Sequence, residues 1–114
     1  MTTVIFEKSA DGRYISFTSF GHAGFAKKHL FFTEPDILCS AISSLTFHTL
    51  NGLSELAREE IAVSQNEETG FIRCMFPEKM QEKSLFLVDC FLQSLQELSK
   101  EYGEDHLKIE IKEG

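Results

Sequence analysis

The sequence predicts a two-layer α+β sandwich whose largely antiparallel sheet carries two helices on one face. Two observations support this fold class. Five short segments alternate apolar and polar residues, and two longer segments repeat apolar residues at helical spacing. Along the chain these segments follow the order β-β-α-β-β-α-β, so hairpins alternate with helices. A chain of 114 residues is long enough for one hydrophobic core, and we expect a single domain over residues 1–114.

The strands are recognised by their two-residue period and by the turn residues between them. In the first segment Val4 and Phe6 fall on one face, and Ala10-Asp11-Gly12 is typical of a turn leading into the second segment. Glu67-Glu68-Thr69 provides the corresponding polar turn of a second hairpin. The strands are expected at residues 2–8, 14–20, 61–66, 70–76 and 106–112.

The helices are recognised by apolar residues three or four positions apart. The first is expected from Asp36 to about Arg58, and the second covers residues 82–102 and stops at Gly103. Their apolar stripes are Leu38, Ile42, Leu45, Leu53 and Leu56 in the first, and Leu85, Val88, Leu92, Leu95, Leu98 and Tyr102 in the second. Because both helices use one face of the sheet, the other face stays open, which favours a homodimer.

The composition excludes several classes of protein. Eleven basic and eighteen acidic residues give a net charge of −7, so the chain lacks the clustered positive charge that binds a nucleic-acid backbone, and a charged partner is expected to be basic. No apolar run is long enough to span a membrane, and the N-terminal segment does not resemble a signal peptide, so we expect a cytoplasmic protein. The three cysteines form no CxxC pair and no zinc-type spacing, which predicts reduced thiols and no metal or cofactor.

The segment between the first hairpin and the first helix carries the candidate chemistry. Residues 22–36 have no sustained period, and we expect them to form a mobile loop. Asp36 stands before the helical period and can cap it, which would place Cys39 in the first turn. There the helix dipole favours the thiolate, so Cys39 is a candidate nucleophile. In a second register Thr33 is the cap and Asp36 the third helical residue, and Cys39 then moves into the second turn.

A nucleophilic cysteine needs a base, and His22 is the preferred candidate. It follows the second predicted strand and lies between Gly21 and Gly24. Glycines allow the backbone to turn and a substrate chain to approach closely, so the loop around Gly24 is a suspected substrate-binding segment.

The other histidines are weaker candidates. His48 lies nine residues after Cys39, which places it on the opposite face of the same helix. Spacing alone does not exclude the remaining two, His29 and His106.

Each of these features also has a simpler interpretation. A single cysteine near a helix start is most often a small buried apolar residue, and this applies to Cys39. The stretch of residues 21–24 is as often an ordinary loop. We assign Cys74, on a strand, and Cys90, inside the second helix, to packing.

Two motifs together resemble a known family. Gly21-His22-Ala23-Gly24 and, downstream, Asp36-Ile37-Leu38-Cys39-Ser40-Ala41-Ile42-Ser43 are similar to the paired motifs of the ribosomal-processing cysteine proteases (Prp). The length and the order of elements are similar over essentially the whole chain. Residues 25–35 depart from the family pattern, because they are longer than the short glycine-containing connection that is usual there.

The resemblance implies a homodimeric, cytoplasmic endopeptidase that removes the N-terminal extension of ribosomal protein twenty-seven of the large subunit. It implies that Cys39 is the nucleophile, that His22 is the general base and that Asp36 is the acidic position before the cysteine. The partner would be the N-terminal segment of a basic ribosomal protein, with no nucleic acid, membrane, metal or cofactor involved. The alternative is a non-enzymatic, ribosome-associated protein-binding module of the same fold with Cys39 buried.

Overall fold

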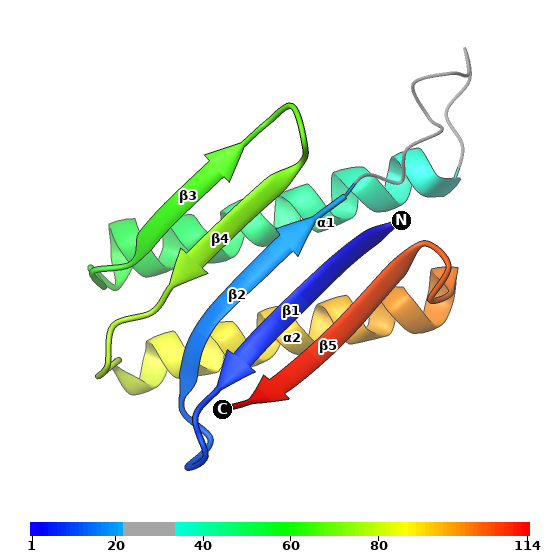
Figure 1. The fold of residues 1–114 in the computed structure, drawn as a ribbon. Helices are drawn as coiled ribbons and strands as arrows, with labels where there is room; N and C mark the ends of the chain where they lie inside the picture. The colour runs from blue at the N-terminus through cyan, green and yellow to red at the C-terminus, as the bar shows by residue number, and fades with distance from the viewer. Residues whose placement is uncertain (22–33) are drawn as a thin grey trace.

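The computed structural model describes the backbone of residues 1–21 and 34–114 and the side chains of residues 1–21 and 37–114. The order β-β-α-β-β-α-β is confirmed, and a short π-helical turn, Gly52–Leu56, follows the first helix (Figure 1). The strands are β1 (Thr2–Lys8), β2 (Tyr14–Phe20), β3 (Ala62–Asn66), β4 (Phe71–Met75) and β5 (Leu107–Glu113). The helices are α1 (Glu34–Asn51) and α2 (Glu82–Tyr102).

The strands form one five-stranded sheet in the order β3-β4-β2-β1-β5. The pairs β1–β2, β2–β4 and β3–β4 are antiparallel, and only β1 and β5 run parallel. A parallel neighbour requires a crossover connection, which α2 provides between β4 and β5. The largely antiparallel sheet predicted from the sequence is therefore confirmed.

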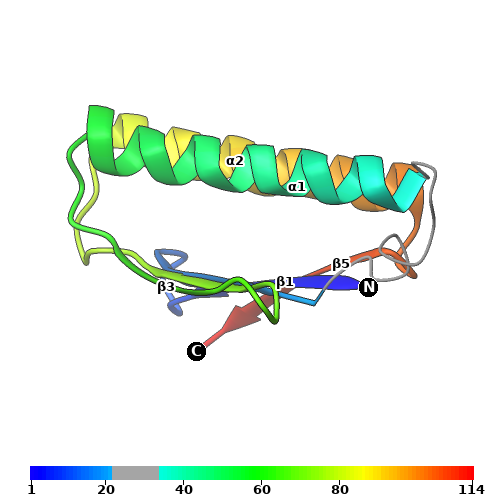
Figure 2. The same cartoon turned by 90° about the horizontal axis from the view of Figure 1, so that it is seen from above.

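Both helices lie on the same face of the sheet, and Figure 2 shows the two layers edge-on. The two-layer α+β class is confirmed. Within the described residues no helix is long and apolar enough to cross a lipid bilayer.

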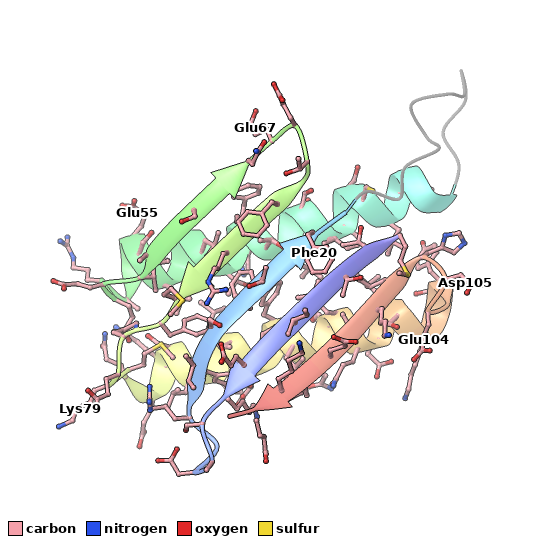
Figure 3. All side chains as sticks on the ribbon, in the orientation of Figure 1. Phe20, Glu55, Glu67, Lys79, Glu104 and Asp105 are labelled. Carbon is pink, nitrogen blue, oxygen red and sulfur yellow. The ribbon has the colours of Figure 1, made fainter. Side chains whose placement is uncertain are left out.

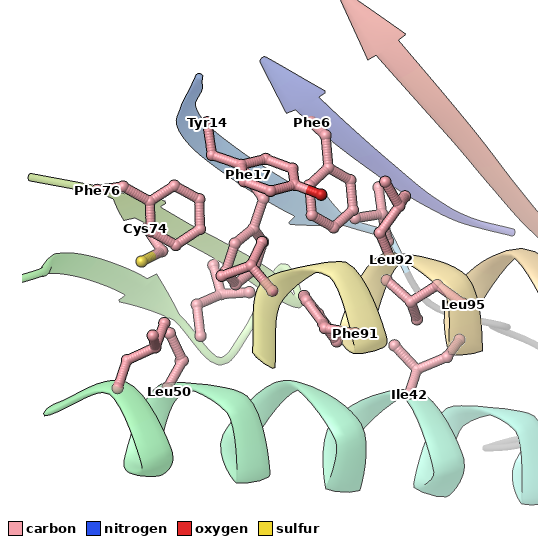
Figure 4. Packing of buried hydrophobic residues seen from close by; sticks show 14 of the residues in the cluster. Phe6, Tyr14, Phe17, Ile42, Leu50, Cys74, Phe76, Phe91, Leu92 and Leu95 are labelled. Atoms are coloured by element: carbon pink, nitrogen blue, oxygen red, sulfur yellow. The ribbon is translucent and has the colours of Figure 1, made fainter. Parts of the chain in front are cut away.

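The core lies between the two layers and is built around three aromatic rings (Figure 4). Phe6 of β1 and Phe17 of β2 are cross-strand partners, and their ring centroids are 5.8 Å apart. Phe91 of α2 packs against both, at 5.7 Å from Phe6 and 5.1 Å from Phe17. Val4, two residues before Phe6, is buried on the same face, as the alternation of residues 2–8 predicts.

The first helix differs from the prediction at both ends. It begins at Glu34, so the last three residues of the expected loop, 34–36, are helical, and residues 22–33 lie outside the described part of the chain. At the other end the chain widens into a π turn, in which the Ala57 N–H donates to the Gly52 carbonyl. The wider turn shifts the helical register, so Leu56, expected in the apolar stripe, is 82% exposed.

The second helix has the predicted bounds, and its stripe faces the sheet. Val88, Leu92 and Leu95 are buried. The assignment of Cys90 to packing is wrong, because this thiol is exposed. Cys90 lies two positions after Val88, which turns it about 200° around the helix axis and away from the core.

Gly21 is expected to be essential for the end of β2. Its φ of +92° is unfavourable for other residues, and a Cβ added there would lie 2.3 Å from the Met1 carbonyl oxygen. Gly12 has a similar φ of +86° with open space around it, so Gly12→Ala should cost about 1–2 kcal/mol from backbone strain alone. Gly21→Ala should lower the free energy of unfolding by clearly more, as measured by urea denaturation. Equal losses in the two variants would contradict a tight fit between Gly21 and Met1.

Tyr14 links β2 to α2 and should make stability depend on alkaline pH. Its hydroxyl donates to Asp89 Oδ1 at 2.5 Å, and burial together with this carboxylate raises the pKa of Tyr14 well above its ordinary 10.0. Below pH 10 the Tyr14 phenol is protonated in the folded and in the unfolded protein, so its hydrogen bond to Asp89 contributes fully to the free energy of unfolding. Above pH 10 the unfolded chain loses this proton first, so the free energy of unfolding falls. Tyr14→Phe should cost about 1 kcal/mol at pH 7, and the difference from wild type should shrink above pH 10. A pH-independent difference in urea denaturation would contradict this.

Candidate active site

One cavity places a candidate nucleophile between the two layers of the fold. It has a volume of about 330 Å³ and lies where the middle turns of α1, residues 39–47, pass over the ends of β2, β3 and β4. Cys39 is part of its wall, and the volume is typical of a small ligand or a few side chains. The complete lining is Thr2, Ser19, Gly21, Cys39, Ile42, Ser43, Thr46, Phe47, Gln65, Asn66, Glu67, Gly70, Phe71 and Ile72.

The helical wall of this cleft is a row of residues four positions apart on α1. Cys39, Ser43 and Phe47 repeat at this interval, which stacks them along one face of the helix. Cys39 is half-buried, and Ser43 and Phe47 are exposed. Cys39 is therefore the least exposed residue of this row.

The sheet wall is set by the end of β2. Ser19 and Gly21 line the cleft, and the Gly21 backbone approaches the Met1 carbonyl too closely for any side chain. Gly21 is also the last described residue before the predicted base His22. The motif of residues 21–24 thus begins at the cleft, while His22 and Gly24 themselves lie outside the described residues.

The β3–β4 hairpin forms the third wall, which the sequence did not predict as part of the site. Gln65, Asn66 and Glu67 line the cleft, and Glu67 lies at the tip of the hairpin (Figure 3). Asn66 organises the turn, because its Oδ1 accepts the Glu68 N–H at 3.0 Å and its carbonyl accepts the Thr69 hydroxyl at 3.4 Å. A polar turn between two strands is common, so its letters alone gave no signal of a binding role.

The three cysteines occupy three different environments. Cys39 lines the cleft, and Cys90 is exposed on α2. Cys74 is fully buried on β4, as its assignment to packing predicts, and burial raises the pKa of its thiol from 9.0 to about 12. Only Cys39 combines access to solvent with a cleft in which a substrate could be held.

The described histidines do not reach this thiol. His48 is exposed on α1 and does not line the cleft, which agrees with its predicted position on the opposite helix face. His106 precedes β5, where its carbonyl accepts the Thr2 N–H, and it is not among the lining residues either. The remaining candidates, His22 and His29, lie outside the described residues.

The backbone decides between the two registers considered for Asp36. Because α1 begins at Glu34, Asp36 is the third helical residue and does not occupy the cap position preferred from the sequence. Cys39 is the sixth residue and lies in the second turn. The effect of a helix dipole falls off within the first turn, so the expected activation of Cys39 by the dipole is weakened.

Comparison with known proteins identifies the family. The model of the family described as cysteine protease Prp matches residues 1–107. The chain belongs to the cysteine protease Prp family. A curated relative, the ribosomal processing cysteine protease Prp of Bacillus subtilis (strain 168), is 26% identical over 113 residues and is aligned over 96% of each chain. Membership in Prp makes this protein a cysteine protease and rules out the non-enzymatic alternative.

Solved structures share the fold. The essential ribosomal processing protease Prp from S. aureus, in complex with a covalently linked product peptide, superposes with a TM-score of 0.84 at 20% identity, covering 98% of this chain and 100% of that one. SMU.848 from Streptococcus mutans gives a TM-score of 0.84 at 23% identity, covering 100% of this chain and 96% of that one. The architecture of this Prp chain is therefore that of the family.

Thiol labelling should separate the three cysteines of this Prp protein. In the native state iodoacetamide is expected to modify Cys39 and Cys90, while Cys74 stays unmodified because it is buried. The raised pKa of Cys74, about 12 against 9.0, leaves roughly a thousandfold less thiolate at neutral pH. Mass spectrometry of digested protein would locate each label, and urea should make Cys74 reactive. Modification of Cys74 as fast as Cys90 in the native state would contradict the structure.

Proposed function

We propose that Cys39 is the nucleophile of this cysteine protease and that His22 is its general acid and base. The observation that supports Cys39 most directly is its place in the cleft, since neither Cys74 nor Cys90 lines it. His22 is supported by the position of Gly21, which lines the same cleft and directly precedes it in sequence. The absence of His48 and His106 from the described lining also favours a base from residues 22–33.

The proposed reaction is acyl transfer through a thioester. The Cys39 thiolate attacks the scissile carbonyl carbon and forms a C–S bond, the C–N bond then breaks, and protonated His22 donates its proton to the leaving amine. In the second step neutral His22 removes a proton from water. The resulting hydroxide attacks the thioester carbonyl carbon, the C–S bond breaks, and the thiolate and protonated His22 are restored. The product leaves as a carboxylic acid, which loses its proton to water.

The position of Cys39 in the second turn determines how its thiolate has to be stabilised. A sixth helical residue is too far along α1 to gain much from the dipole, so an imidazolium partner supplies the main stabilisation. The free N–H groups of the first turn precede Cys39, and Pro35 contributes none because it lacks an N–H. We propose that backbone N–H groups at this helix start stabilise the oxyanion, with Asp36 positioned within the same turn.

We propose that the substrate is the N-terminal extension of ribosomal protein twenty-seven. The curated relative is named a ribosomal processing protease, and the chain shares the family's paired motifs around His22 and Cys39. A ribosomal protein is strongly basic, and this chain has a net charge of −7. The cleft combines apolar side chains such as Ile42, Phe47 and Phe71 with the acidic Glu67, a composition suited to an apolar segment next to basic residues.

We also propose a cytoplasmic homodimer that binds no nucleic acid directly. The sheet face opposite the helices is not covered by any described element, and Phe20 at its margin is 41% exposed. The acidic net charge disfavours contact with a phosphate backbone. Analytical ultracentrifugation at micromolar concentration is expected to give twice the mass of the 13.0 kDa chain.

Incubation of the ribosomal protein twenty-seven precursor with four variants tests the proposed chemistry. Wild type should release a defined N-terminal peptide, seen by mass spectrometry, and Cys39→Ala should release none. His22→Ala should lower kcat by about 10²- to 10⁴-fold, which is the usual contribution of a general acid and base. The matched controls Cys90→Ala and His48→Ala replace an exposed thiol and an exposed imidazole outside the cleft and should keep full activity.

The outcome assigns the base as well as the nucleophile. If His22→Ala keeps full activity, a fifth variant, His29→Ala, is needed, and its loss of activity would move the base to His29. An active Cys39→Ala variant would refute the proposed nucleophile. An intact precursor in the presence of wild type would refute the proposed substrate.

A further inference from the structure

The two edges of the sheet differ in their protection against another strand. β5 forms one edge and carries charged residues on its outer positions, including the ion pair between Lys108 and Glu110 at 3.3 Å. Natural proteins place charges or proline on edge strands to prevent pairing with other chains. β3 forms the other edge with the sequence Ala-Val-Ser-Gln-Asn, which contains neither. Within residues 1–21 and 34–114 the sheet therefore has one edge protected by charges and one edge that can accept a strand.

The helices leave the side chains of β3 exposed. Val63 is the cross-strand partner of Cys74, so both side chains point toward the helices. Cys74 is fully buried, whereas Val63 is 45% exposed, and all five residues of β3 are exposed. Although α1 passes behind β3 in Figure 1, the helices thus leave the β3 side chains exposed on the side of the active-site cleft.

This space continues into the cleft that holds Cys39. Gln65 and Asn66, the last two residues of β3, line the cleft together with Phe47 of α1. Phe47 is 42% exposed, and it lies on the row of α1 residues that begins with Cys39. A strand added to β3 would place alternate side chains on the helix side, near Val63. Its continuation past Asn66 would enter the cleft whose walls include Phe47 and Cys39.

The charges around β3 favour a basic partner. Glu60 precedes the strand, and Glu67 and Glu68 follow it, and all three are exposed. Within the described part of the chain no cationic side chain forms an ion pair with them. An extended peptide with Lys or Arg residues on both sides of its paired segment would neutralise the glutamates at the two ends of β3.

We propose that the peptide substrate binds by strand addition, as a sixth strand on the outer edge of β3. Main-chain hydrogen bonds to alternate residues of β3 would supply affinity, and side chains directed toward Val63 and Phe47 would supply specificity. The site selects an extended, basic polypeptide segment and presents its backbone to Cys39. This inference deepens the proposed peptidase function and rests on Cys39 being the nucleophile.

Hydrogen–deuterium exchange on the Cys39→Ser variant tests the docking edge. The probe is a synthetic peptide that spans the N-terminal extension of ribosomal protein twenty-seven, which this variant should bind without cleaving. Amides of β3 are expected to exchange about tenfold more slowly when the peptide is saturating, because they become paired. Unchanged β3 exchange with the peptide bound would overturn the proposal. So would protection that depends on protein concentration and not on peptide, because a second copy of the chain would then occupy the edge.

Charge substitutions at the two edges provide a matched control. Ser64→Lys adds one positive charge to β3 and should raise the Kd for the peptide about two- to fivefold. Glu113→Lys changes the charge by two on the opposite edge and should leave the Kd unchanged. An equal effect of both variants would indicate that net charge alone attracts the peptide and would overturn docking at β3.

A peptide with N-methyl groups on alternate amides isolates the main-chain contribution. Its side chains are unchanged, but the methylated amides cannot donate to a neighbouring strand, so its Kd should rise about fivefold per lost bond. Equal Kd values for the methylated and unmodified peptides would also overturn the proposal.

The cleavage assay separates this proposal from the proposed function. Cleavage by wild type with no protection of β3 would refute strand addition and leave the protease chemistry intact. Protection of β3 without cleavage would refute the proposed chemistry and support the docking edge.

Discussion

The structure depends on one constraint, which is that both helices pack on the same face of a five-stranded sheet. The two-residue period of β1 and β2 directs Phe6 and Phe17 toward the helices, and a slip of one residue would turn both rings to solvent. Phe91 fixes α2 against these rings. Because α1 then packs beside α2, its middle turns pass over the ends of the strands, and the cleft forms there.

Close packing between the helices also explains how α1 ends. A Cβ added at Gly52 would lie 2.7 Å from Leu87 Cδ2, so the residue that begins the π turn is the one that allows the two helices to approach. The π turn then redirects the chain, and Arg58 adopts a φ of +58° before β3 begins. The path from the end of α1 to the exposed edge of the sheet is thus set by a local change in helix geometry.

Much of the fold could be predicted from the sequence, because alternation and helical spacing are physical consequences of a one-sided core. Residues 2–8, 14–20 and 82–102 have the expected bounds. Leu56 was expected to be buried because the apolar spacing does not reveal the π turn that shifts the helical register. Cys90 was expected to be buried because a cysteine fits a buried or an exposed position equally well. Cys39 was found from its motif, but the wall contributed by the β3–β4 hairpin depends on tertiary packing that no local pattern records.

The start of α1 at Glu34 changes the origin of the reactivity that we propose for Cys39. A thiol in the first turn would be activated by its own helix, whether or not a base were present. A thiol in the second turn depends on a partner, and the chain that leads to the proposed partner leaves the sheet at Gly21. The tight contact between Gly21 and the Met1 carbonyl fixes that departure point on the cleft wall. The proposed chemistry is therefore tied to the pairing of β1 with β2, and a change that loosens this strand end should reduce activity before it unfolds the protein.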